Sequence, residues 1–214
     1  MLEAAHELHL VSLAGFAGMR PVEPPLIPRW RNELAEYAAR LDRPVIVGHS
    51  LGGSLSLAIG QHARNDVAAV VTVHGYPDHA AVLLPERTAE ERHNHALIQA
   101  KAWGAKSELD FVSSLERSLV TMMNGDPCNV LRDMQSSDRQ SVGQVMLELF
   151  ALRVEGDLGV PVMALLPELE MRTAQFQAMA GCELHHIADA KHFIMLDQPK
   201  AVATLVRDFA KRVL

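Results

Sequence analysis

The 214-residue sequence has few of the features that mark specialised classes of protein. It contains only two cysteines, Cys128 and Cys182, which are too few for a disulfide framework and lack the spacing of a metal site, so we expect two free thiols. Aromatic residues make up 5% of the chain. Charged residues make up 21% with a net charge of −6, which gives no electrostatic reason to expect nucleic acid as a partner.

Long apolar runs are also missing from the chain. No stretch of about 18 apolar residues is present, so we expect no membrane span. Residues 1–7 lack the basic start and apolar stretch of a secretion signal. We therefore expect a cytoplasmic protein that binds neither membranes nor nucleic acids.

Short apolar runs that alternate with helical patterns are what the chain does contain. The runs predict strands at 9–13, 44–47, 67–73, 160–166 and 183–187. Apolar residues recur at helical spacing over 29–41, from 54 to about 60, and over 201–214. Strands that alternate with helices predict an α/β fold with a mostly parallel sheet covered on both faces.

Between residues 74 and 156 the pattern is helical only. Ser137 or Asp138 is placed to cap the last helix of this region. We predict an α/β core formed by 1–75 and 157–214, with 76–156 inserted as a helical cap over the carboxyl edge of the sheet.

The string Gly48-His49-Ser50-Leu51-Gly52-Gly53 lies between a predicted strand and a predicted helix. This context favours a nucleophile elbow, in which a strained turn exposes the serine hydroxyl. The elbow directs the Leu51 N–H and the helix N-terminus toward developing negative charge. We expect Gly48 and Gly52 to leave room where strand and helix meet, and Gly53 to relieve crowding in the first helical turn.

A serine needs a neighbouring base, and the best placed histidine is His192, in the loop before the last helix. His49 is expected in the wall of the site, and His74 is expected to be an ordinary loop residue. The carboxylate that would orient the base is less clear. Four candidates stay open: Glu170, Glu168, Asp78 and Asp138.

The elbow and the string His192-Phe-Ile-Met-Leu-Asp-Gln-Pro199 together resemble the α/β-hydrolase superfamily. The opening Leu10–Gly18 resembles a subgroup of small, capped bacterial members. The resemblance implies Ser50 as nucleophile, His192 as base, and hydrolysis of a small, largely apolar ester or thioester without cofactor or metal. An ungapped alignment places Glu170 where the family has its aspartate.

The resemblance also implies an N-terminally shortened core, because family members have further strands before this point. Three outcomes are open. The sequence begins too late; or the strand at 9–13 slides beside the elbow strand, so that the Phe16 N–H becomes the second oxyanion donor; or a second copy pairs with the exposed sheet edge as a homodimer. The competing function is a non-catalytic, hydrolase-like binder of small molecules, or a truncated remnant.

Overall fold

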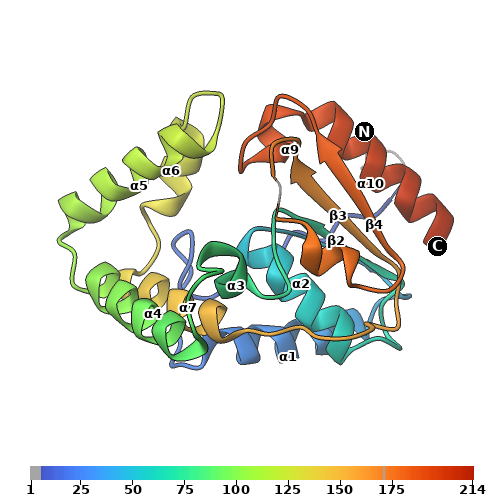
Figure 1. Ribbon diagram of the computed structural model, residues 1–214, viewed down its shortest axis with the longest axis horizontal. Coiled ribbons are helices and arrows are strands. Elements are labelled where there is room, and N and C mark those ends of the chain that lie inside the picture. The colour runs from blue at the N-terminus through green and yellow to red at the C-terminus, as the bar shows by residue number, and fades with distance from the viewer. Residues whose placement is uncertain (1–5, 171) are drawn as a thin grey trace.

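Four parallel strands form the centre of the computed structural model, which describes residues 6–170 and 172–214 (Figure 1). In the described residues the sheet order is β1 (Val45–His49), β2 (Ala69–Val73), β3 (Val162–Pro167) and β4 (Cys182–Ile187). The last four predicted strands are thereby confirmed. Residues 1–5, which carry most of the expectation about a secretion signal, lie outside the described residues.

Helices cover both faces of this sheet. On one face, α2 (Leu51–His62) packs on β1 and β2, and α1 (Leu26–Ala38) packs against α2. On the other face lies α10 (Pro199–Val213), whose Val206 and Phe209 join the apolar side chains of β2 and β3. Every residue of β2 and β3 is buried, as expected for strands covered on both sides. The predicted α/β architecture is confirmed.

A helical insertion separates β2 from β3. It consists of α3 (His79–Leu83), α4 (Ala89–Gly104), α5 (Glu108–Met122), α6 (Cys128–Met134) and α7 (Arg139–Ala151). Figure 1 shows α4, α5 and α6 set to one side of the sheet, with α7 returning toward α1. The predicted cap of α7 is confirmed for Asp138, whose Oδ2 accepts from the Ser141 N–H at 2.8 Å.

Glu148 of α7 links the helical insertion to the core through two hydrogen bonds to α1. Its two carboxylate oxygens accept the N–H groups of Leu26 and Ile27 at 2.9 and 2.6 Å. These are the first two residues of α1, which begins after Pro25 without a side-chain cap of its own. A carboxylate at this end of a helix also complements the helix dipole. The insertion thus supplies the cap that α1 lacks.

The strand predicted at 9–13 is absent from the structure, and this prediction was wrong. His9 Nδ1 lies 2.7 Å from the Tyr37 hydroxyl on α1, and Leu10 is almost fully exposed. Farther on, the Gly15 carbonyl accepts from the Asp138 N–H at 2.8 Å. These contacts hold the segment against α1 and the start of α7, so it does not slide beside the elbow strand.

The elbow strand β1 therefore pairs with β2 alone among the described residues. Val47 of β1 is 50% exposed, as expected for an edge strand. Pairing of this edge with a second copy stays a prediction.

Two short helices complete the fold, α8 (Ala174–Gln177) and α9 (Ile194–Asp197). Cys128 and Cys182 are free thiols, as predicted. Across 6–170 and 172–214, no helix has the length and apolar character needed to cross a bilayer.

Candidate active site

Ser50 occupies a sharp turn between β1 and α2. Its φ of 52° and ψ of −117° are strained for a residue other than glycine. The Ser50 N–H donates to the Val73 carbonyl of β2 at 2.9 Å, and its carbonyl accepts from Ser54 at 3.0 Å. These two hydrogen bonds keep the turn in place at the start of α2, as predicted for an elbow.

Three glycines allow the elbow to close. A Cβ on Gly48 would overlap the Gly52 carbonyl, and one on Gly53 would lie 2.5 Å from Thr72 Oγ1. A Cβ on Gly75, in the loop after β2, would lie 2.5 Å from the Ser50 carbonyl oxygen. The expectations for Gly48 and Gly53 are confirmed. The expectation for Gly52 was wrong, because a Cβ there would meet no described atom within 4 Å apart from its chain neighbours and the backbone of its own helix.

His192 contacts the residue that precedes Ser50 in the elbow and the residue that follows the neighbouring strand β2. His49, which precedes Ser50, donates its Nε2–H to the His192 carbonyl at 2.9 Å. His74, which follows β2, places its Nδ1 2.9 Å from His192 Nδ1. Since His49 pairs with Val73 in the sheet register, residues 49, 50 and 74 lie together, and His192 closes over them.

Burial keeps these imidazoles neutral at neutral pH. It lowers the pKa of His192 to about 3, with a smaller contribution from the nearby His49, His74 and His79. It lowers the pKa of His49 to about 4, although the bond to the His192 carbonyl opposes this shift. The pKa of His74 is lowered by burial and raised in part by Glu170. His192 is thus unprotonated and available as a base.

Glu170 lies beyond His74 as seen from His192. Its Oε2 is 3.6 Å from His74 Nε2, and it is 7% exposed. Burial alone would raise the pKa of Glu170, but hydrogen bonds from the Arg172 side chain and backbone lower it to about 2. The buried ring of Tyr76 lies beside this pair; burial and the Glu170 charge raise its pKa. Glu170 is therefore ionised but contacts His74, where the sequence predicted contact with His192.

The other three carboxylates that the sequence left open as triad acids have other contacts or lie in solvent. Asp78 caps α3 and pairs with Arg153 at 2.8 Å. Asp138 caps α7, and Glu168 is exposed. The prediction that His74 is an ordinary loop residue was wrong. Its position directly after the strand beside the elbow strand was the signal that could have identified it.

The two predicted oxyanion donors differ. Leu51 is the first residue of α2, so its N–H has no acceptor within the helix. The Phe16 N–H instead donates to the Leu13 carbonyl at 3.1 Å, and the Phe16 ring packs on Trp30 with centroids 5.7 Å apart. The structure therefore gives Phe16 a place in a turn and in the core, which does not support it as a second donor.

Among the described residues, the Ser50 hydroxyl and His192 Nε2 form no hydrogen bond. Catalytic hydrogen bonds are often long before substrate binds, so this arrangement leaves both groups available for reaction. In the same part of the chain, no group of three or more His, Cys, Asp or Glu side chains has an arrangement that would hold a metal ion.

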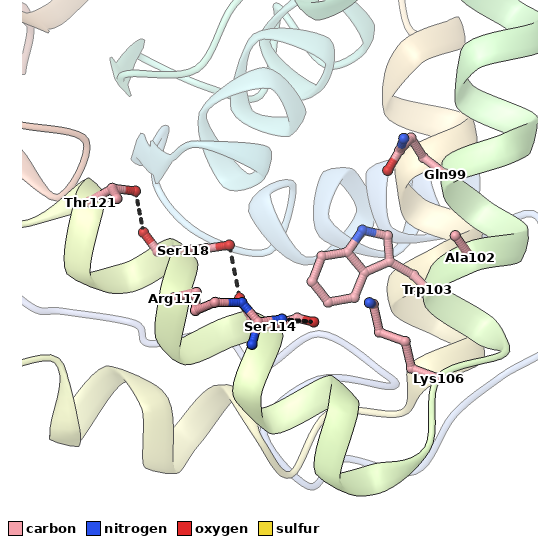
Figure 2. Close-up of a pocket in the computed structure, with 8 residues that line it drawn as sticks. All are labelled: Gln99, Ala102, Trp103, Lys106, Ser114, Arg117, Ser118 and Thr121. Atoms are coloured by element: carbon pink, nitrogen blue, oxygen red, sulfur yellow. Dashed lines mark hydrogen bonds between the residues drawn. The ribbon is translucent and has the colours of Figure 1, made fainter.

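A separate pocket of about 400 Å³ lies between α4 and α5 (Figure 2). Lys106 lies over the Trp103 ring, 5.1 Å from its centroid, and Arg117 donates to Ser114 at 3.2 Å. The pocket is lined by Gln99, Ala102, Trp103, Lys106, Ser114, Arg117, Ser118 and Thr121. Neither Ser50 nor any of the histidines around it contributes to this lining.

An elbow serine at the carboxyl edge of a parallel sheet, with a histidine loop after the last strand, defines an α/β-hydrolase site. The comparison of sequences agrees, since residues 2–205 match the model of the alpha/beta hydrolase family. The chain belongs to that family. No curated protein matches it.

Solved structures confirm the fold. An esterase from Thermogutta terrifontis superposes with a TM-score of 0.72 at 14% identity, over 94% of this chain and 78% of the other. MenH from S. aureus gives 0.71 at 14% identity, over 94% and 82%. The enol-lactonase from Burkholderia xenovorans LB400 gives 0.68 at 16% identity, over 93% and 78%.

Proposed function

We propose that the protein is a serine hydrolase that acts on small, largely apolar esters or thioesters through an acyl-enzyme on Ser50. The observation that carries this proposal is that His192 contacts both His49 and His74, which lie on either side of the strained Ser50 elbow. A non-catalytic binder of small molecules would have no physical need for a neutral, partly buried histidine beside a strained serine turn.

In the proposed reaction Ser50 is the nucleophile and His192 is the general base. His192 Nε2 takes the Ser50 proton while Oγ attacks the substrate carbonyl, and the Leu51 N–H with the α2 N-terminus stabilises the oxyanion. The intermediate collapses to the acyl-enzyme as His192 returns the proton to the leaving group. Water, activated by His192 in the same way, then releases the acid and regenerates Ser50.

The helical insertion supports the choice of substrate class. The Phe193 N–H, next to His192, donates to the Met122 carbonyl at the end of α5 at 3.3 Å. The insertion therefore reaches the histidine loop and is placed to act as a cap that excludes water from an apolar acyl group. The esterase and the enol-lactonase of the same fold are consistent with hydrolysis of esters.

Covalent labelling with a fluorophosphonate, read by intact mass, tests the proposal. We expect one adduct on the wild-type protein, none on Ser50→Ala, and slow labelling of His192→Ala, because a base contributes about 10²–10⁴ in rate. A set of p-nitrophenyl esters of increasing chain length then defines the acyl group. An unlabelled wild-type protein would support the alternative, a non-catalytic binder that retains the fold.

A further inference from the structure

Three side chains form a continuous line from the base to a buried carboxylate. His192 Nδ1 lies 2.9 Å from His74 Nδ1, and His74 Nε2 lies 3.6 Å from Glu170 Oε2. The side chains of His74 and Glu170 are 13% and 5% exposed, so little water competes for these contacts. The His74 imidazole thus takes the place that a triad acid would occupy, and Glu170 stands one ring farther away.

The charge of Glu170 determines which nitrogen of each imidazole along this line carries a proton. Ionised Glu170 can only accept, so a neutral His74 carries its proton on Nε2, facing the carboxylate. His74 Nδ1 is then an acceptor, and the short contact requires His192 to donate from its own Nδ1. That tautomer leaves His192 Nε2 with a free lone pair, which is the form a general base needs.

We propose that His74 is a positioning residue, which transmits the orienting effect of Glu170 to His192 and shares the charge that His192 acquires. When the Ser50 proton reaches His192 Nε2, the Nδ1 proton of His192 shifts toward His74 Nδ1. Positive charge then moves onto the ring beside the Glu170 carboxylate, and no proton leaves the line. This inference rests on the proposed function, because it assigns a role within the same reaction.

Several titratable groups face the line and affect its charge. His49 of β1 and His79 of α3 stand near His192 and oppose its protonation. Arg172 pairs with Glu170 and opposes protonation of His74. Tyr76 also packs on His74, and the groups of the His192 loop itself are Asp189, Lys191 and Asp197.

The decisive variants change His74 in steps. In His74→Asp, a carboxylate oxygen takes the place of Nδ1, because both atoms are two bonds beyond Cβ. It should accept from His192 directly and make Glu170 unnecessary. In His74→Asn, an amide oxygen at the same point keeps the first hydrogen bond and cuts the link to Glu170. His74→Phe removes both contacts.

The readouts are fluorophosphonate labelling rates and kcat/KM for a p-nitrophenyl ester, measured from about pH 5 to 9. We expect His74→Phe to lose about 10²–10³ in rate and His74→Asp to recover to within about tenfold of wild type. In this range the wild-type protein should show no acid limb from His192, whereas His74→Asp should show one, because an adjacent carboxylate stabilises protonated His192 and raises its pKa. A purely structural His74 would not be replaced by a buried aspartate.

Glu170→Gln gives the second half of the test, with Glu168→Gln on the exposed part of the same loop as its control. Glu170→Gln should slow the wild-type protein by about tenfold or more, yet change His74→Asp and His74→Asn by less than about twofold. Equal effects in all three backgrounds, or a His74→Phe protein as fast as wild type, would overturn the proposal. If His74→Phe does not fold, the His74→Asn comparison decides alone.

Nitrogen NMR of the imidazoles separates this inference from the proposed function. We expect Nδ1–H on His192 and Nε2–H on His74 in the resting protein, and loss of the single His192 tautomer in Glu170→Gln. These tautomers without any Ser50 labelling would refute the hydrolase but keep the line of contacts from His192 to Glu170. An Nε2–H tautomer of His192 in a protein that labels at Ser50 would refute the line alone.

Discussion

Replacement of Ser54 by alanine should destabilise the protein by an amount far above that of an ordinary serine. Ser54 lies in α2 and is fully buried. Its hydroxyl donates to the Tyr76 carbonyl at 2.8 Å and accepts from the Tyr76 N–H at 3.0 Å. Removing the hydroxyl leaves both backbone groups of Tyr76 buried without these partners.

The magnitude follows from the two lost partners. A buried polar group that loses its hydrogen bond costs about 1–3 kcal/mol, so the loss of both partners in Ser54→Ala should cost about 2–6 kcal/mol. For a chain of this size each kcal/mol lowers Tm by about 2–4 °C, which predicts a fall of roughly 4–24 °C. The loop that carries His74 and Gly75 would loosen with Tyr76, so we also expect slower labelling at Ser50.

Ser56→Ala is the matched control, two residues along the same helix. Ser56 is equally buried, but its hydroxyl donates only to the Gly53 carbonyl within α2. Its loss should cost less than about 1 kcal/mol, because that carbonyl also lies inside the helix ladder. Urea unfolding of both variants gives the comparison. Equal free energies of unfolding for the two would refute the reasoning from Tyr76.

Two further predictions concern stability. Glu148→Gln removes the charge and one acceptor from the start of α1, and should lower the free energy of unfolding by about 1–3 kcal/mol. The control Glu36→Gln, on the exposed face of α1, should lower it by less than about 0.5 kcal/mol. Equal losses in urea unfolding would contradict the role of Glu148 as the cap of α1. Burial holds the pKa of His192 near 3 and that of His49 near 4, so the unfolded chain binds these protons first as pH falls. Stability should therefore decrease from the ordinary histidine pKa of about 6.5 down toward 4, and a Tm unchanged over this window would contradict the burial of neutral imidazoles.

Local patterns in the sequence were sufficient to predict the elbow and the histidine loop. Ser50 lies between an apolar run and an apolar helix, and His192 follows the last strand, so each position depends on residues close by in the chain. The role of His74 depends instead on the register that pairs His49 with Val73. That register is a contact between distant segments, and no periodicity within one segment encodes it.

The segment at 9–13 is a second case in which contacts between distant segments, and not the local pattern, determine the structure. Its apolar composition satisfies the pattern of a strand, but a strand also needs a neighbouring edge with which to exchange backbone hydrogen bonds. The hydrogen bond between His9 and Tyr37 and the one between Gly15 and Asp138 hold the segment elsewhere. The apolar composition predicted a strand, but these contacts hold residues 9–13 in an irregular segment outside the sheet.

The pairing of Glu170 with Arg172 bears on the proposed substrate class. In a triad, an acid beside the histidine raises the basicity of the imidazole. Here the carboxylate is neutralised in part by a guanidinium whose Nε lies 2.7 Å from Oε1, and it acts through a second imidazole. Burial and the neighbouring imidazoles hold the pKa of His192 near 3, so His192 is a weak base. A weak base with one secure oxyanion donor is best matched to acyl groups that already react readily and release good leaving groups. Thioesters and activated esters meet that requirement, whereas amides, whose carbonyl carbon reacts slowly with a weakly activated serine, do not.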